Sequence, residues 1–355
     1  MHHSSHRAMI ESVEPRRLLS VSAALNGATL EVASDAAGDY VNVSTLRQTD
    51  GTATVRSGTT SVYLDPAALA LAGLTISGAN STGTPASADY QVGFPITAST
   101  SFRYNVDPFA PLSGQIAHSG TVSFNNNTIT VGNFAIGFDP SRATGSRSGF
   151  FVQDTFGGLG ILFDVGAPTA ATISASTFSV TADLLVSPEF AGALNNTALA
   201  GADAGNALVD GRSVANKAPF VVVTGQGFTK RFAASGVNSV QIDMNGGNDT
   251  VSLLNLSKPT SVSLGDGNDR LYNVNGGGAF AASAGNGDDY LNLLGGRFSS
   301  VSVDAGAGND AVVATGVRIS GVASFNGGSG HDRLWSFGSD IDRSDATNFE
   351  FRLIV

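Results

Sequence analysis

The chain has 355 residues, of which 44 are glycine, 14% are charged and none is cysteine. This length predicts more than one domain, and the mean hydropathy of +0.10 argues against disorder, which requires low hydrophobicity and high net charge. The net charge of -10 disfavours nucleic acid and anionic lipid as partners and favours small cations. The missing cysteines exclude disulfides and Cys-ligated zinc, and no apolar run reaches the roughly 18 residues of a membrane-spanning helix. The composition predicts an ordered, turn-rich, all-β protein.

Residues 1–24 predict an export or targeting segment. The stretch Glu14-Pro15-Arg16-Arg17-Leu18-Leu19 places two arginines before an apolar patch that is shorter than the roughly 7–15 apolar residues of a secretory signal. These residues resemble the N-terminal Leu-Glu-Pro-Arg-x-Leu-Leu motif of large exported planctomycete proteins, although Val13 stands where that family has leucine. The resemblance implies export and says nothing about activity.

Residues 25–217 predict one strand-rich domain. Short alternating segments are separated by Gly, Asp and Asn, and the region from Tyr90 to Val186 is rich in phenylalanine. Short strands at close spacing predict an antiparallel sandwich or barrel, and we expect a β-sandwich-like domain. The phenylalanines could form a sugar-stacking face. A Phe-filled core is favoured, because Phe lacks the polar group that Tyr and Trp bring to binding surfaces.

Two short helices and one loop are predicted within this region. Asp65-Pro66 begins a helix that ends near Leu71, and Ser187-Pro188 begins one that ends near Leu194, because each pair supplies an N-cap and a proline at the first helical position. Residues 195–217 are rich in Ala, Gly, Asn and Asp, which predicts a loop or linker. A strand over 218–223 then leads into the C-terminal domain.

Motifs for catalysis are lacking in the sequence. It contains no HExxH, GxSxG or GxxxxGK[ST] pattern. Three of the five histidines lie in the first seven residues, and His118 lies in a strand-like segment where we expect a structural side chain. Asp139 and Asp154 could act as a hydrolytic pair of carboxylates only if the fold brought them together. We therefore expect no enzyme.

One short phrase is repeated five times between Asn245 and Leu334. Its closing aspartates stand at 249, 269, 289, 310 and 332, so the gaps are 20, 20, 21 and 22 residues. Each copy has a glycine turn, an alternating strand, a second turn and a second strand. We therefore expect residues 218–355 to form a parallel β-solenoid resembling a β-roll, with coils about 4.8 Å apart.

Aliphatic residues of the repeat predict the solenoid core. The residue two positions after each aspartate should point inward and form a ladder: Val251, Leu271, Leu291, Val312 and Leu334. The facing sheet should contribute a second set: Val240, Ile242, Val262, Leu264, Val303 and Val322.

The turns have the pattern Gly-x-Gly-Asn/Asp-Asp, which favours a calcium site. Glycine permits positive φ, so carbonyl oxygens can point toward a common centre. Calcium prefers roughly 6–8 oxygen ligands from carboxylates and carbonyls, and a cation would cancel the repulsion of aspartates stacked about 5 Å apart. The candidate calcium-binding residues are Asp249, Gly265, Gly267, Asn268, Asp269, Gly285, Gly287, Asp288, Asp289, Gly306, Gly308, Asn309, Asp310 and Asp332.

These turns resemble the GGxGxDxUx repeat of RTX or haemolysin-type proteins, with Leu271, Leu291 and Val312 at the aliphatic U position. The resemblance implies calcium held by aspartate and turn carbonyls in secreted or surface proteins of bacteria. In that family both edges of an 18-residue coil carry such turns, whereas here only one turn per coil is acidic. We expect at most four calcium sites along one edge, weaker at the ends, where Asn245 and His331 replace repeat residues.

The expected function is that of a non-enzymatic, calcium-binding protein that is secreted or exposed on the bacterial cell surface, with an adhesive or structural role. Surface glycans and other exported proteins are candidate further partners. Three alternatives stay open: a metal-free solenoid held by Asx turns and left-handed residues, zinc at His331 and Asp332, and a secreted hydrolase or carbohydrate-binding protein with its site in the central domain. The end of the chain, 349–355, should cover the last coil or act as an export signal.

Overall fold

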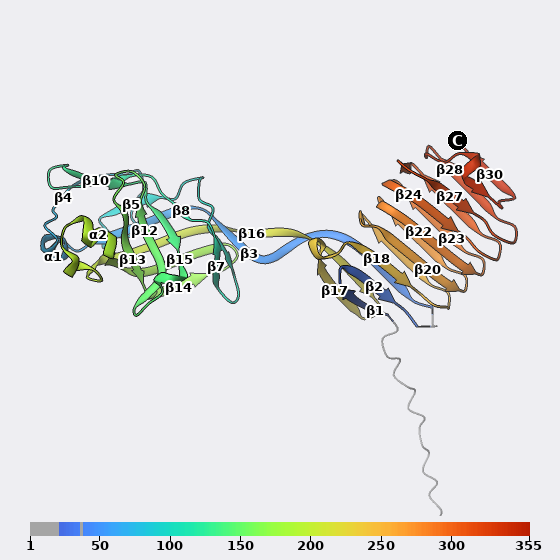
Figure 1. Ribbon diagram of the computed structural model, residues 1–355, viewed down its shortest axis with the longest axis horizontal. Coiled ribbons are helices and arrows are strands. Elements are labelled where there is room, and N and C mark those ends of the chain that lie inside the picture. The colour runs from blue at the N-terminus through green and yellow to red at the C-terminus, as the bar shows by residue number, and fades with distance from the viewer. Residues whose placement is uncertain (1–20, 36–37) are drawn as a thin grey trace, which may run out of the picture. The chain divides into compact units, whose positions relative to one another are not determined.

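The computed structural model describes residues 21–35 and 38–355, and most of these residues lie in β-strands (Figure 1). The expected all-β class is confirmed. The described chain divides into two compact units: Thr49–Lys217, here called the barrel unit, and the residues on both sides of it, up to Gln48 and from Ala218 onward, here called the solenoid unit. The export-like motif at 14–19 lies outside the described residues.

The solenoid unit has two sheets, and consecutive coils contribute parallel strands to each (Figure 1). The first sheet contains, in spatial order, β1 (Ser22–Asn26), β2 (Thr29–Ala33), β18 (Ser239–Asp243), β20 (Thr260–Asp266), β22 (Gly277–Asn286), β24 (Arg297–Asp304), β27 (Ala323–Asn326) and β29 (Ala346–Thr347), with β26 (Arg318–Ile319) beside β24. The second contains β3 (Tyr40–Leu64), β19 (Thr250–Leu254), β21 (Arg270–Val274), β23 (Tyr290–Leu294), β25 (Ala311–Thr315), β28 (Arg333–Phe337) and β30 (Phe351–Ile354). Short 3-10 turns lie at Ala234–Gly236 and Arg343–Asp345.

The first coil of the solenoid precedes the barrel unit in the chain. β2 pairs in parallel with β18, and β3 pairs in parallel with β19, which places Val41 opposite Val251. The assignment of residues 25–48 to the central domain is corrected by these pairings. Only β1 and β2 form a hairpin there, and the broken strand pattern of that stretch does not reveal a partner some 200 residues away. The barrel unit is an insertion between the first and second coils.

The solenoid core matches the predicted ladder with one exception. All five ladder residues have 0% exposure, and the registers place Leu271 opposite Val251 and Leu291. On the facing sheet Val322 is 72% exposed, although the sequence placed it inside. The coil that contains Val322 is longer than the preceding coils, so the alternation of inward and outward side chains shifts. Phe325 instead lies opposite Val303 in the core.

The end of the chain extends the stack of coils. β30 pairs in parallel with β28 and places Leu353 opposite Trp335, while Phe349 is buried. The predicted C-terminal strand is confirmed, and it covers the last repeat as a further coil.

The barrel unit is a ring of antiparallel strands. β3 pairs with β5 (Val92–Pro95), and a bridge between Ile96 and His118 joins β5 to β8 (Ile116–Ala117). From β8 the ring continues through β11 (Ala135–Phe138), β12 (Arg147–Asp154), β13 (Gly160–Gly166), β15 (Thr177–Val186) and β16 (Asp203–Gly225), which pairs with β3. The sequence allowed a sandwich or a barrel, and we expected a sandwich-like domain. The structure shows a closed barrel instead.

Smaller elements surround this ring (Figure 1). β6 (Arg103–Asn105) and β7 (Ala110–Ser113) form a hairpin, and β14 (Ala170–Ile173) pairs with β15. A separate three-stranded sheet contains β4 (Ile76–Asn80), β9 (Thr121–Phe124) and β10 (Ile129–Gly132). In the solenoid unit, the far end of β16 pairs with β17 (Phe228–Ala233).

Both predicted helices are confirmed. Asp65 caps α1 (Pro66–Leu71), and Ser187 caps α2 (Pro188–Ala193). Two 3-10 turns lie at Pro140–Arg142 and Thr197–Leu199. No helix of the described chain is long and apolar enough to cross a membrane.

The loop predicted for residues 195–217 is wrong beyond Ala202, because β16 begins at Asp203. Its small residues serve close contact between strands. A Cβ at Gly205 would lie 2.1 Å from the carbonyl oxygen of Tyr63, and one at Gly58 would lie 2.1 Å from that of Asp210. Glycine here allows β3 and β16 to approach each other.

Phenylalanines form much of the core of the barrel unit, as favoured from the sequence, although Phe109 and Phe156 are exposed. Phe102 packs at 5.4 Å from Phe178, and Phe94 lies 4.9 Å from Phe134. The buried members are Phe94, Phe102, Phe124, Phe163, Phe178 and Phe190.

Candidate metal site in the aspartate row

The five repeat aspartates lie one above another along one edge of the solenoid. Each precedes a strand of the second sheet, and the register of that sheet aligns the residues that follow them, with Arg270 opposite Thr250 and Tyr290. The aspartates are 0–2% exposed. The structure therefore brings together the acidic residues that the repeat predicted, and we call them the aspartate row: Asp249, Asp269, Asp289, Asp310 and Asp332.

Hydrogen bonds run along the row from coil to coil. Oδ1 of Asp269 accepts from the backbone N–H of Asp249 at 2.7 Å. The same hydrogen bond recurs three times at 2.8 Å, each from the N–H of one aspartate to Oδ1 of the next: Asp269 to Asp289, Asp289 to Asp310 and Asp310 to Asp332. Each aspartate thus holds the turn of the preceding coil with one of its two oxygens.

Two further carboxylates extend the row. The N–H of Asp39 donates to Oδ1 of Asp249 at 2.6 Å, and the N–H of Asp332 donates to Oε2 of Glu350 at 2.6 Å. Sequence reasoning missed both. Asp39 could have been found, because it follows a glycine and stands two residues before Val41, as in the repeat. Glu350 has no glycine turn before it and carries no such signal.

The second oxygen of each row aspartate is buried, and in the described chain it has no hydrogen-bond partner. Burial, together with the neighbouring carboxylates, raises the pKa of Asp289 to about 7 and the pKa of Asp249 to about 6. Burial raises the pKa of Asp310 to about 6 and raises the pKa values of Asp269 and Asp332. A buried anion without a partner is costly, so each Oδ2 requires a proton or a cation beside it.

The glycines of the turns allow the coils to stack closely. A Cβ on Gly267 would lie 2.0 Å from the carbonyl oxygen of Gly247, and a Cβ on Gly287 would lie 2.1 Å from that of Gly267. Gly308 has the same contact with Gly287. The first glycines of the turns, Gly265, Gly285 and Gly306, lie equally close to the preceding turn. Carbonyl oxygens are therefore also stacked along this edge.

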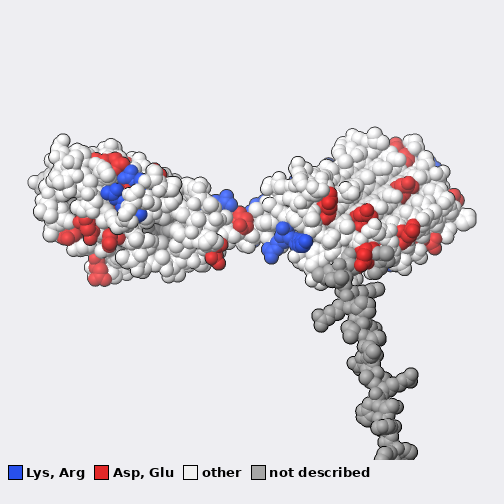
Figure 2. Space-filling view, turned by 60° about the horizontal axis from the view of Figure 1, so that its bottom comes forward, with Lys and Arg blue, Asp and Glu red and all other residues white. Residues whose placement is uncertain are grey.

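Residues at the fourth position of the turn have a different role from the aspartates. Asn268, Asp288 and Asn309 are exposed. Oδ1 of Asn268 accepts from the N–H of Asp288 at 3.0 Å, and Oδ1 of Asp288 accepts from the N–H of Asn309 at 2.7 Å. These side chains hold successive turns together on the solvent side. Further exposed acidic side chains, drawn red in Figure 2, lie over the coils.

The donor set of the row fits calcium in part. Each row aspartate offers one buried carboxylate oxygen without a hydrogen-bond partner, and the stacked turns also contain carbonyl oxygens. Both are hard donors of the kind that calcium prefers. Across the described residues, no three His, Asp or Glu side chains form a group that could hold a metal ion. An ion at this row therefore needs turn carbonyls as additional ligands. The same observation leaves the zinc alternative at His331 and Asp332 without a third His, Asp or Glu side chain among the described residues.

The opposite edge of the solenoid has neutral and basic turn residues where the sequence predicted them, and Asp340 there pairs with Arg318 at 3.4 Å. Its turns contain Gly276 and Gly296, and Arg297 lies opposite Arg318 in the register of β24 and β26. Asn255 and Asn275, with positive φ, form the neighbouring turns. The buried aspartate row therefore lies along one edge of the solenoid.

Three polar residues of the barrel unit that the sequence singled out, Asp139, Asp154 and His118, have hydrogen-bond partners within the unit. Asp154 accepts hydrogen bonds from the N–H groups of Gly132, Phe156, Gly157 and Leu159, and Asp139 caps the turn at Ser141. His118 is buried, with Nε2 2.7 Å from the hydroxyl of Thr60.

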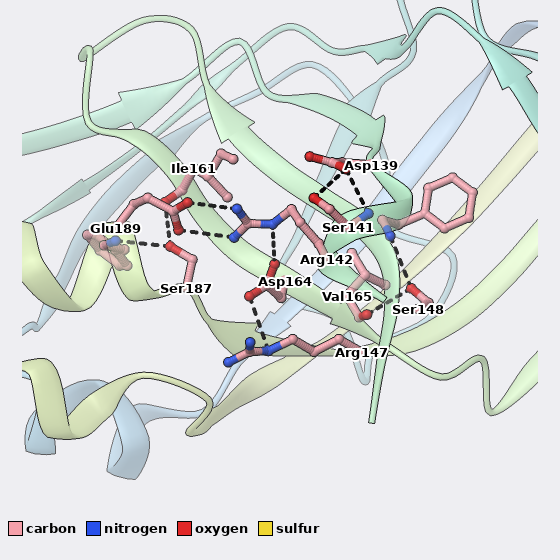
Figure 3. Close-up of polar contacts among 12 residues, drawn as sticks. Asp139, Ser141, Arg142, Arg147, Ser148, Ile161, Asp164, Val165, Ser187 and Glu189 are labelled. Atoms are coloured by element: carbon pink, nitrogen blue, oxygen red, sulfur yellow. Dashed lines mark hydrogen bonds and ion pairs between the residues drawn. The ribbon is translucent and has the colours of Figure 1, made fainter. Parts of the chain in front are cut away.

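An ion cluster joins four elements of the barrel unit: the turn at Pro140–Arg142, β12, β13 and α2 (Figure 3). Arg142 contacts Asp164 at 2.6 Å and both oxygens of Glu189 at 2.7 and 3.0 Å, and Arg147 approaches Asp164 at 3.2 Å. Hydrogen bonding to Arg142 lowers the pKa of Glu189 to about 2. Both carboxylates are thus engaged by arginine, and the cluster fixes α2 and β13 to the turn that contains Arg142.

No family model and no curated protein sequence matches this chain. Function is therefore inferred from the chemistry of the aspartate row.

Proposed function

We propose that the solenoid unit binds calcium ions between successive turns of the aspartate row, and that the protein is an exported, non-enzymatic calcium-binding protein with a structural or adhesive role at the cell surface. One observation carries the proposal: five buried carboxylate oxygens, stacked in register, lack a partner in the described chain. Bound calcium supplies the positive charge that these oxygens require. The RTX resemblance and the arginine-containing motif at 14–19 support export.

The residues that would hold the ions are the row aspartates, through Oδ2, and the stacked carbonyls of turn glycines such as Gly267 and Gly287. The exposed Asn268, Asp288 and Asn309 act by holding the turns in place. The end turns retain the local geometry, since Asn245 adopts φ +60° where later copies have glycine. We still expect the central sites to bind more tightly, because each has a complete repeat turn on both sides.

Thermal unfolding tests the proposal. Trp335 is the only tryptophan and lies in β28, so its fluorescence reports the solenoid unit alone. A ligand that binds only the folded state stabilises it by about 2.7 kcal/mol per site at 100 times its dissociation constant. We expect millimolar calcium to raise the Trp335 melting temperature of the full chain by roughly 5–10 °C or more relative to EGTA.

Charge-matched variants make the test specific. Asp289→Asn removes one carboxylate from the centre of the row and should reduce the calcium-dependent shift, whereas Asp210→Asn removes an exposed carboxylate of the barrel unit and should leave it unchanged. Asp332→Asn should have a smaller effect than Asp289→Asn. An equal melting temperature in calcium and EGTA would refute the proposal and favour the metal-free solenoid.

A further inference from the structure

The interior of the barrel unit contains two adjoining cavities. The larger has a volume of about 170 Å³ and the smaller about 60 Å³. Ile136, Val152, Leu184 and Ala207 line both, so these side chains lie between the two cavities. Protein interiors contain few voids larger than one water, and the larger cavity would hold roughly six waters at about 30 Å³ each.

The walls of these cavities are apolar. Phe150 and Phe178 line the larger one together with aliphatic side chains, and Phe94 and Phe163 line the smaller. Such a cavity stays dry and takes apolar molecules, as an engineered cavity of ~150 Å³ takes benzene.

The few polar side chains of the walls already have partners. In the smaller cavity His118 contacts Thr60 through Nε2 at 2.7 Å and the carbonyl of Phe134 through Nδ1 at 2.9 Å. Burial lowers the pKa of His118 to about 4, so it is neutral at pH 7. In the larger cavity the hydroxyl of Ser148 donates to the carbonyl of Val165 at 2.8 Å. The walls therefore offer no charge to a ligand, which selects for a neutral one.

The larger cavity has a side that solvent can reach. Phe109, Pro168 and Ala171 line it and are exposed. Phe109 lies in the turn between β6 and β7, with its ring 6.1 Å from that of Phe178. A side chain in a surface turn can move aside at lower cost than one within a strand. The mouths of β-barrels are common sites for small ligands.

We propose that the barrel unit binds a small neutral apolar molecule, a monocyclic arene or a short alkyl chain, in the cavity walled by Phe150, Phe178 and Leu184, with Phe109 at its entrance. This site is separate from the aspartate row and does not depend on calcium binding there.

Calorimetric titration of the full chain with toluene tests the site. We expect saturable one-to-one binding that persists in EGTA. Ala182→Leu places a larger side chain in the wall of the larger cavity and should weaken toluene binding by about tenfold or more. Ala281→Leu makes the same change on the exposed surface of the solenoid and should leave binding unchanged.

A second variant tests the same site by enlargement. Leu184→Ala removes part of the wall that both cavities share, so it should increase the affinity for n-octane over that of the unchanged protein severalfold. The absence of saturable toluene binding by the unchanged protein would overturn the proposal. Unaltered toluene binding by a folded Ala182→Leu variant would also overturn it. If Ala182→Leu does not fold, the n-octane affinity of Leu184→Ala decides.

Discussion

At the residue scale, the glycines of each turn determine how closely the coils stack. Gly287 has φ +129°, and an added Cβ would lie 2.1 Å from the carbonyl oxygen of Gly267. Gly316 has φ +63°, and no atom lies within 4 Å of its Cβ position. Both positions disfavour other residues through φ, but only Gly287 adds a collision with rigid backbone.

This difference predicts a pair of substitutions with unequal effects. Gly316→Ala should destabilise the solenoid unit by about 1 kcal/mol, the usual cost of a left-handed non-glycine residue. Gly287→Ala should cost roughly 3 kcal/mol or more, because the stacked turns must also separate. Trp335 fluorescence during urea unfolding measures both. Equal losses would show that the close carbonyl contact does not limit stacking.

The sequence predicts those features of the fold that depend on residues close together in the chain. The repeat and the alternation of aliphatic residues after each aspartate predicted the solenoid and its ladder, because both are local patterns. Asp65 and Ser187 predicted the two helices by capping. The first coil could not be recognised, since Val41 meets Val251 only after an insertion. Burial of the row aspartates and their second, unpartnered oxygens depends on stacking and likewise required the structure.

At the scale of elements, the row of stacked turns links stability to pH. The pKa of Asp289 is about 7 in the folded protein against an ordinary 3.8, and those of Asp249 and Asp310 are about 6. Between about pH 4 and 7 the folded, calcium-free row therefore binds more protons than the unfolded chain does. The stability of the calcium-free protein is then greatest below the pKa that these carboxyl groups have in the unfolded chain. It falls as the pH rises through their higher pKa values in the folded protein.

The expected outcome is a melting temperature that depends on pH only without calcium. In EGTA the Trp335 transition should be lower at pH 8 than at pH 5 by roughly 5 °C or more. Saturating calcium should reduce this difference, because the cation favours the ionised carboxylates. Asp289→Asn removes one titrating group and should also reduce the difference in EGTA. A calcium-free melting temperature that rises from pH 5 to pH 8 would contradict the assigned pKa shifts.

At the scale of the whole molecule, the two units have separate hydrophobic cores. Among the described residues, every member of the solenoid core lies before Thr49 or after Lys217, and every member of the two barrel-unit cores lies between them. The two chain connections run through β3 and β16, which pair with each other. Thr54 and Asn216 are joined by a hydrogen bond of 3.0 Å near this junction, so the ends of the insertion lie close together.

Separate cores predict that the solenoid folds without its insertion. Replacing residues 49–217 by a short Gly-Ser linker should leave a cooperative Trp335 transition within about 5 °C of that of the full chain in calcium, because a short loop costs little closure entropy. The calcium-dependent shift should persist, since all row aspartates remain. Toluene binding should disappear together with the cavity. Loss of the cooperative transition would show instead that the first coil, which precedes the insertion, depends on the barrel unit for its fold.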